Sequence, residues 1–137
     1  MSIAGLRFGH VAFKVADVER SVRWYGDAFG ATKMYHAPAQ GDRPELMFLE
    51  FSKGQYIELF TGGKNILPSP VDPIGYVHFC LVVDNLEQAL EHLAKMNVKP
   101  ERKFIGRAQQ RIAFISDPDG NSIELMEIPP ESEIYRA

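Results

Sequence analysis

The feature that most constrains the fold is an internal repeat. The segment FGHVAFKVADVERSVRWY, which begins at Phe8, aligns with YVHFCLVVDNLEQALEHL, which begins at Tyr76. Further along each half, LMFLEFSKGQYIELF from Leu46 aligns with IAFISDPDGNSIELM from Ile112. Two aligned blocks in the same order indicate that one supersecondary unit occurs twice, so the structure of one half predicts that of the other.

The alignment pairs two histidines and two glutamates. His10 aligns with His78 at a spacing of 68 residues, and Glu58 aligns with Glu124 at a spacing of 66. The second copy is therefore two residues shorter between its aligned blocks. Chance alignment seldom matches residues of this chemistry twice, so these four positions are the first candidates for function.

Each half has the pattern strand, helix, three strands. Residues 9–15 alternate between apolar and polar, which is typical of a half-buried strand. Asp17 and Asn85 precede apolar residues at helical spacing and are suited to cap helix N-termini, and Gly30 is suited to end the first helix. The remaining strands are predicted at 31–37, 45–51, 55–61, 101–106, 111–116 and 121–127.

These elements predict an α+β fold built from two βαβββ modules. The first module spans about 6–61 and the second about 76–128, and a Gly- and Pro-rich linker spans about 62–75. A length of 137 residues is that of one ordinary domain, so we expect 1–137 to form a single domain.

Composition excludes several classes of protein. The chain is 45% hydrophobic and 24% charged, which is near the average for globular domains, and its net charge of −3 disfavours nucleic acid as a partner. No run approaches the roughly 20 apolar residues of a membrane span. The only cysteine is Cys80, so no intrachain disulfide can form. We therefore expect a cytoplasmic protein that acts on a small molecule.

The four paired residues are predicted to point to one face. His10 lies on the strand face opposite the apolar face of residues 11–15, and each of Glu58, His78 and Glu124 lies between apolar neighbours. The period of two therefore turns all four away from the face that packs on the helices. Two nearby carboxylates repel each other unless a positive charge lies between them. Imidazole nitrogens and carboxylate oxygens together suit a divalent cation. We therefore expect these four side chains to bind one metal ion if the two halves form one curved sheet.

The chain also resembles a known family. The segments GHVAFKVADVERSVRWYGDAFG, GYVHFCLVVDNLEQAL and DPDGNSIELMEI resemble the vicinal oxygen chelate superfamily, which includes glyoxalase I, dioxygenases, fosfomycin-resistance enzymes and bleomycin-resistance proteins. The resemblance extends from about Leu6 to Ile128. It implies a half-open barrel of paired βαβββ modules around a metal site.

Within that superfamily, the set His10, Glu58, His78 and Glu124 resembles the ligands of bacterial glyoxalase I (lactoylglutathione lyase). The resemblance implies one nickel or cobalt ion per site, with zinc, manganese or iron as alternatives. It implies a lyase or isomerase that converts a hemithioacetal to a thioester through proton abstraction next to a carbonyl and a metal-stabilised enediolate. Glu124 is then the expected base, and Glu58 its counterpart in the other half.

Two positions depart from glyoxalase I. Lys14 stands where that enzyme has an arginine, and Gly62 stands where it has an asparagine, so we expect a thiol other than glutathione or a non-thiol substrate. Arg107 and Arg111 belong to a basic cluster around Gly106. With Lys14, they are the candidates for binding an anionic substrate.

Other functions fit parts of the pattern. An epimerase or an Fe(II) dioxygenase of the same superfamily is one alternative, although a dioxygenase needs open metal positions and Glu58 would take one. A non-enzymatic drug-binding protein of the bleomycin-resistance type is another, and it would retain its ligand without metal. A homodimer is expected because each half leaves edge strands that need covering, with each site either inside one chain or shared between chains.

Overall fold

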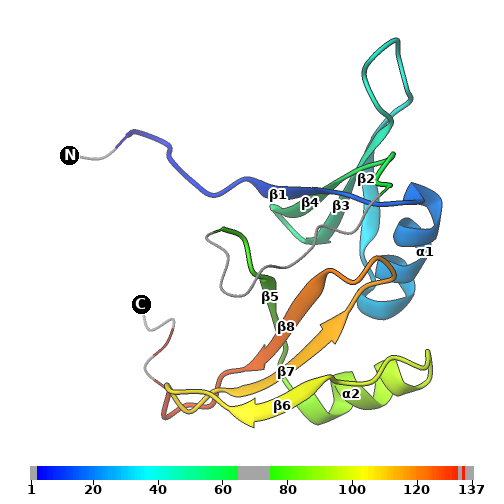
Figure 1. Ribbon diagram of the computed structural model, residues 1–137. Helices are drawn as coiled ribbons and strands as arrows, with labels where there is room; N and C mark the ends of the chain where they lie inside the picture. Colours follow the sequence, from blue (N-terminus) through cyan, green and yellow to red (C-terminus); the bar gives the residue numbers. More distant parts are fainter. Residues whose placement is uncertain (1–2, 65–74, 133, 135–137) are drawn as a thin grey trace. The chain divides into compact units, whose positions relative to one another are not determined.

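The computed structural model describes residues 3–64, 75–132 and 134 (Figure 1). The chain divides into two compact units, residues 1–66 and 67–137. Most of the predicted linker, residues 65–74, lies outside the described residues. None of the helices in the described parts of the chain is long and apolar enough to span a membrane.

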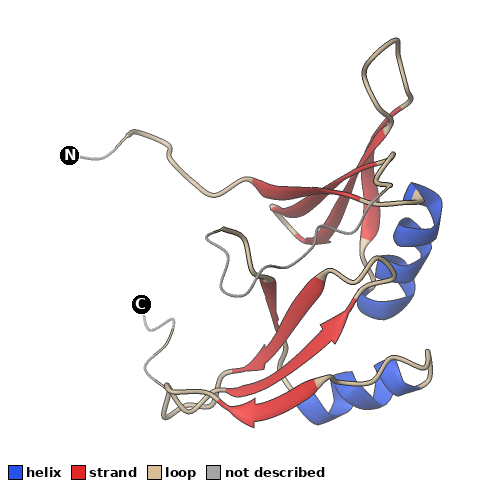
Figure 2. Ribbon diagram, viewed as in Figure 1, coloured by secondary structure: helices blue, strands red, loops and turns tan. Residues whose placement is uncertain are grey.

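The first unit is a four-stranded mixed sheet with one helix (Figure 2). Its strand order is β1-β4-β3-β2, with β1 parallel to β4 and the other neighbours antiparallel. Its elements are β1 (His10–Lys14), α1 (Val18–Phe29), β2 (Thr32–Ala37), β3 (Leu46–Ser52) and β4 (Gln55–Phe60).

The second unit repeats this topology. Its strand order is β5-β8-β7-β6, and β5 is parallel to β8 while the other pairs are antiparallel. Its elements are β5 (Phe79–Val82), α2 (Leu86–Ala94), β6 (Arg102–Ile105), β7 (Arg111–Ser116) and β8 (Ser122–Glu127). The predicted α+β fold of two βαβββ modules is confirmed. Each sheet is open and keeps two edge strands, so a barrel formed by both modules together stays a prediction.

Both helices begin, and α1 ends, at the residues that the sequence indicates. The Asp17 side chain accepts a hydrogen bond from the backbone N–H of Arg20 at 3.0 Å, and the Asn85 side chain accepts one from Gln88 at 3.0 Å. Gly30 ends α1 with φ at 69°, in the left-handed region that other residues rarely adopt. Local side-chain chemistry therefore sets the register of both helices.

Each sheet packs one face on its own helix. In the first unit, the Tyr25 ring of α1 lies 6.5 Å from Phe13 and 6.1 Å from Phe51, and Leu49 and Leu59 are fully buried. In the second unit, α2 contacts β7 and β8. The largest fully buried side chains of the second unit are Leu86, Leu93, Ile115, Ile123 and Leu125. Strand alternation leaves the opposite face of each sheet for other side chains, and we call this the helix-free face.

Candidate metal-binding site

His10 and Glu58 meet on the helix-free face of the first sheet. His10 begins β1, and Glu58 lies opposite Ala12 on the neighbouring strand β4. Side chains two residues apart on a strand lie on the same face, so His10 and Ala12 share a face. The His10 side chain therefore contacts Glu58 diagonally across the two strands. The distance from His10 Nε2 to Glu58 Oε2 is 3.0 Å.

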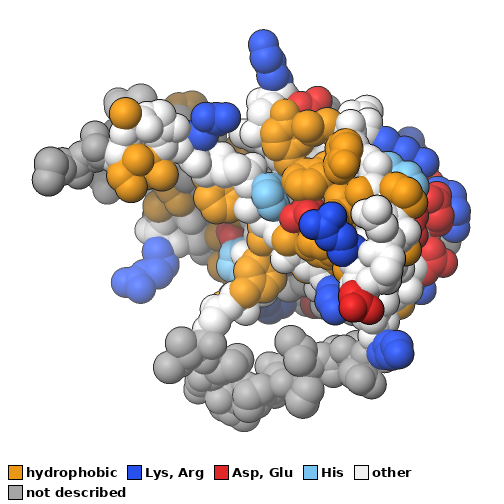
Figure 3. All heavy atoms as spheres, turned by 90° about the horizontal axis from the view of Figure 1, so that it is seen from above, with side chains coloured by type: hydrophobic (Ala, Val, Ile, Leu, Met, Phe, Trp, Pro, Cys, Tyr) orange, Lys and Arg blue, Asp and Glu red, His pale blue; other side chains and the backbone are white. Residues whose placement is uncertain are grey.

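His78 and Glu124 repeat this arrangement in the second unit. His78 directly precedes β5, and Glu124 lies opposite Cys80, two residues further along. The distance from His78 Nε2 to Glu124 Oε2 is 2.7 Å. The side-chain exposure is 40% and 30% for the two histidines, and 12% and 10% for the two glutamates. Each histidine is therefore accessible from solvent, while each glutamate is largely buried. Histidine side chains are visible at the surface in Figure 3, beside acidic and hydrophobic ones.

A phenylalanine supports each histidine. The His10 ring contacts Phe48 with a centroid distance of 5.0 Å and an interplanar angle of 82°. The His78 ring contacts Phe114 at 5.0 Å and 80°. Each phenylalanine is directly opposite the glutamate on the next strand. The sequence alone indicated no role for these phenylalanines, although their equivalent positions in the two halves were the signal that could have found them.

The two His–Glu–Phe groups suit metal binding chemically. Nitrogen and oxygen ligands each about 2.1 Å from an ion are about 3.0 Å apart when they bind at right angles. The observed nitrogen–oxygen separations of 3.0 and 2.7 Å fit two such neighbouring ligands. Among the described residues, no group of three or more His, Cys, Asp or Glu side chains is placed to hold a metal ion, so the four-residue ligand set stays a prediction.

Cys80 shares the helix-free face of the second sheet. It packs against a buried apolar cluster that consists of Ile112, Phe114 and Met126. Burial, with a smaller contribution from the Glu124 carboxylate, raises the pKa of Cys80 to about 12. The thiol is thus neutral at physiological pH and packs as a small apolar side chain.

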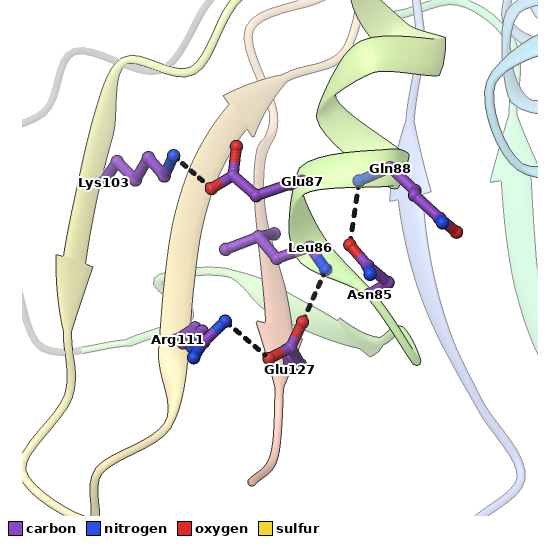
Figure 4. A network of polar contacts seen from close by, with 7 residues as sticks. All are labelled: Asn85, Leu86, Glu87, Gln88, Lys103, Arg111 and Glu127. Carbon is purple, nitrogen blue, oxygen red and sulfur yellow. Dashed lines mark hydrogen bonds and ion pairs between the residues drawn. The ribbon is translucent and has the colours of Figure 1, made fainter.

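The predicted substrate-binding cations are divided between faces. Lys14 ends β1 on the same face as His10 and is exposed. Arg111 alternates with Ile112 on β7, so it lies on the face opposite that of Phe114, where it pairs with Glu127 at 3.3 Å (Figure 4). The structure therefore does not bring Arg111 to the face of His78. Arg107 is exposed in the turn between β6 and β7. Substrate binding by these residues stays a prediction.

A pocket of about 510 Å³ lies beside the N-terminus of α2, and no residue of either His–Glu pair lines it. The lining residues are Leu86, Glu87, Lys103, Phe104, Ile105, Arg111 and Ile112. Lys103 forms an ion pair with Glu87 there, and Glu127 accepts a hydrogen bond from the Leu86 N–H at 2.9 Å (Figure 4). These contacts join α2 to the strands beneath it.

Arg102 is the cation on the helix-free face of the second sheet. It lies opposite Phe114 on the neighbouring strand, and its guanidinium carbon is 4.5 Å from the Phe114 ring centroid and 5.6 Å from that of Phe104. It belongs, with Lys103, Arg107 and Arg111, to the basic cluster around Gly106 from which the sequence predicted binding of an anionic substrate. Strand alternation across 101–106 was the signal that separates Arg102 from Lys103.

The family of the chain follows from comparison with known proteins. Residues 7–125 match the model of the Glyoxalase/Bleomycin resistance protein/Dioxygenase superfamily. The protein belongs to this superfamily, as its resemblance in sequence predicted.

Among curated relatives, the chain is 25% identical to the lactoylglutathione lyase of Pseudomonas aeruginosa, over 94% of this chain and 86% of that protein. It is 32% identical to the uncharacterized protein YaeR of Escherichia coli, over 86% and 93%. The chain spans about half the length of the plant and fission-yeast relatives that it also matches.

Solved structures show the same fold. A glyoxalase family protein from Enterococcus faecalis has a TM-score of 0.80 at 20% identity, with 91% of this chain and all of that chain covered. The fosfomycin resistance protein FosX from Listeria monocytogenes, solved with Mn(II), has a TM-score of 0.72 at 17% identity, with 98% and 100% covered.

Proposed function

We propose that the protein is a divalent-metal-dependent isomerase of the glyoxalase I kind. Its substrate would be a hemithioacetal of an α-ketoaldehyde and a thiol, and its product a thioester. The observation that carries the proposal is the repeated His–Glu–Phe group, whose nitrogen–oxygen and ring–ring geometry is nearly the same in both units. The match to the superfamily and the lactoylglutathione lyase relatives support it.

The residues that would hold the ion are His10, Glu58, His78 and Glu124. Two imidazole nitrogens and two carboxylate oxygens form a mixed donor set suited to nickel or cobalt, and also to zinc, manganese or iron. When bound, the ion would act as a Lewis acid that polarises the carbonyl oxygen of the substrate.

Proton transfer would be the task of Glu124. Its side chain is 10% exposed, and Phe114 and Cys80 lie opposite it on the two neighbouring strands, so few water molecules compete for the carboxylate. The carboxylate would take the proton from the carbon next to the carbonyl and return it to the adjacent carbon. This transfer changes no oxidation state overall and needs no organic cofactor. Glu58 would be its counterpart in the other half.

The thiol part of the substrate would differ from glutathione. Lys14 keeps a positive charge on the helix-free face of the first sheet but lacks the two-pronged hydrogen bonding of arginine. Gly62 has no side chain to donate or accept a hydrogen bond. We therefore propose weak turnover of the glutathione adduct and faster turnover of another adduct.

We also propose that the protein is a homodimer. Sedimentation measures its mass in solution and tests this proposal.

The metal site is tested by His78→Ala with His36→Ala as the matched control. His36 Nε2 also contacts a carboxylate, that of Glu45 at 2.8 Å, but this pair is not one of the repeated groups. We expect His78→Ala to lower the metal content of the purified protein at least tenfold, and His36→Ala to leave it unchanged, by elemental analysis. Full metal occupancy in His78→Ala would refute the ligand set.

The reaction is tested with methylglyoxal hemithioacetals of several thiols, with and without oxygen. We expect metal-loaded protein to form thioester under anaerobic conditions, because proton transfer consumes no oxygen. Metal-loaded protein that forms no thioester from any of the thiols would refute the isomerase.

A further inference from the structure

A row of three side chains crosses the helix-free face of the first sheet. Tyr56 on β4 lies opposite His10 on β1 and opposite Glu50 on β3. Strand alternation puts this row on the same face as Phe48 and Glu58, because Phe48 precedes Glu50 by two residues and Glu58 follows Tyr56 by two. Neighbouring strands are about 4.8 Å apart, so Tyr56 is one strand and Glu50 two strands away from the candidate ligand His10.

Glu50 and Tyr56 are joined by a hydrogen bond. The Glu50 carboxylate accepts from the Tyr56 hydroxyl and, at 3.4 Å, from the backbone N–H of Gly54. Both side chains are partly exposed. Across residues 3–64 and 75–132, no Lys, Arg or His forms an ion pair with Glu50, and the charge of Arg7 acts on Tyr56 less strongly than Glu50 does. The carboxylate therefore has acceptor sites that these two bonds do not fill.

The open acceptors of this pair suit a cation that donates hydrogen bonds. Tyr56 uses its only hydroxyl hydrogen on Glu50, so its oxygen can only accept a further bond, and an ionised carboxylate has no donor at all. A protonated amine that donates to these oxygens forms charge-assisted hydrogen bonds, which are stronger than neutral ones. An oxyanion would find no donor here and would be repelled by the carboxylate.

The equivalent row of the second unit has a different chemistry. Ser122 on β8 and Ser116 on β7 lie opposite each other, at the places that Tyr56 and Glu50 have in the first unit. The Ser116 hydroxyl donates a hydrogen bond to Glu101. The two units thus repeat the His–Glu–Phe group but not the row beside it, so the acidic pair is not part of what the repeated metal ligands require.

We propose that Glu50 and Tyr56 form a specificity-determining subsite that binds a protonated amine of the substrate. The proposal rests on the proposed function, since it places this amine on the thiol part of the substrate. Glu50 would supply the negative charge, and Tyr56, oriented by Glu50, would supply a second acceptor next to His10. Neither residue would take part in the proton transfer itself.

The kinetic test compares two thiols of the same shape in the full-length, metal-loaded protein. The methylglyoxal adduct of 2-(dimethylamino)ethanethiol carries a protonated tertiary amine, which does not condense with the aldehyde, and the adduct of 3-methylbutane-1-thiol has a CH group in its place. We expect Glu50→Gln to raise the ratio of KM for the cationic adduct to KM for the neutral adduct about tenfold, because a charge-assisted hydrogen bond is lost.

Three further variants sharpen this comparison. Tyr56→Phe removes a neutral acceptor and should raise the KM ratio less, by about two- to fivefold. Glu50→Asp keeps the charge and should retain part of the preference for the cationic adduct. Glu45→Gln is the matched control, because the Glu45 carboxylate contacts His36 and lies outside the row, and it should leave the ratio unchanged.

The binding test does not depend on turnover. Full-length, zinc-loaded protein labelled with nitrogen-15 is titrated with N,N-dimethylethylammonium chloride, and the amide signal of Gly54 is followed by NMR, because this N–H donates to the Glu50 carboxylate. We expect a saturable shift of the signal in the wild-type protein and at least tenfold weaker binding in Glu50→Gln. Sodium chloride at the same concentrations should give no saturable shift. If no adduct is turned over but the Glu50-dependent shift is found, the isomerase proposal fails and this one stands.

Three results would overturn the subsite. One is a KM ratio that stays unchanged in both Glu50→Gln and Tyr56→Phe. Another is an equal rise of the ratio in Glu45→Gln. The third is the absence of a saturable shift of the Gly54 signal in the wild-type protein. A far-ultraviolet circular dichroism spectrum and a melting curve establish that each variant is folded, which the partial exposure of Glu50 and Tyr56 favours.

Discussion

The two units have the same topology and the same His–Glu–Phe geometry, but their cations are placed differently. On the helix-free face, the first unit carries Lys14 where the second has Val82, and the second carries Arg102 where the first has Tyr35. The repeated donors are the residues on which the proposed metal site depends. Lys14 and Arg102 are not repeated, which makes them candidates for contacts with a substrate, because the two ends of a substrate differ chemically.

Burial of the carboxylates does not distinguish the units, because the side chains of Glu58 and Glu124 are exposed to 12% and 10%. Their surroundings do distinguish them. Phe114 is buried in a cluster with Ile112 and Met126, whereas Phe48 is only partly buried. The partly buried residues that pack on this cluster are Cys80, Ile128 and Ile134. The second unit therefore surrounds its glutamate with more apolar material.

The largest expected effect is a difference in kcat between variants of the two glutamates, Glu58 and Glu124. Glu124→Gln keeps an oxygen ligand but removes the base, and we expect kcat for the preferred hemithioacetal to fall by about 10²–10⁴. Glu58→Gln should lower kcat by less, because the surroundings of Glu124 are the more apolar and favour it as the base. Glu45→Gln, in the unrepeated His36–Glu45 pair, is the control and should leave kcat unchanged. Equal losses in both halves would show that the two glutamates are interchangeable.

The next effect concerns the two cores. Leu59 and Leu125 are equivalent residues, and both are 0% exposed. We expect Leu59→Ala and Leu125→Ala each to lower the free energy of unfolding by about 2–5 kcal/mol, because each opens a cavity under a helix. Denaturant unfolding measures the loss. Ile105→Ala, at an exposed site, should cost less than about 0.5 kcal/mol. A large difference between the two leucines would mean that the cores are not equivalent.

The smallest effect concerns the helix caps. Asp17→Ala and Asn85→Ala each remove the acceptor for one backbone N–H at the start of a helix. We expect each to lower the free energy of unfolding by about 0.5–2 kcal/mol. Asp17→Asn and Asn85→Asp keep an acceptor oxygen and should restore most of the loss in the same denaturation experiment. No loss in the alanine variants would show that the caps contribute nothing to stability.

Several features were predictable from the sequence because their causes are local. The predicted strands agree with the observed ones within one or two residues, since alternation and turn residues act over a few positions. Asp17 and Asn85 cap their helices because a side-chain oxygen directly before a helix accepts a hydrogen bond from the backbone N–H three residues later. The internal repeat then extended each local inference to the other half.

By itself, the sequence thus determined two βαβββ modules, the start of both helices, the end of α1 and the face on which His10, Glu58, His78 and Glu124 lie. Only the tertiary structure decided which side chains meet across strands. The contacts of Phe48 and Phe114 with the histidines, and of Arg102 with Phe114, depend on the register between neighbouring strands. Register joins residues that are far apart in the chain, so a cluster of four basic residues in sequence could not show which one shares a face with His78.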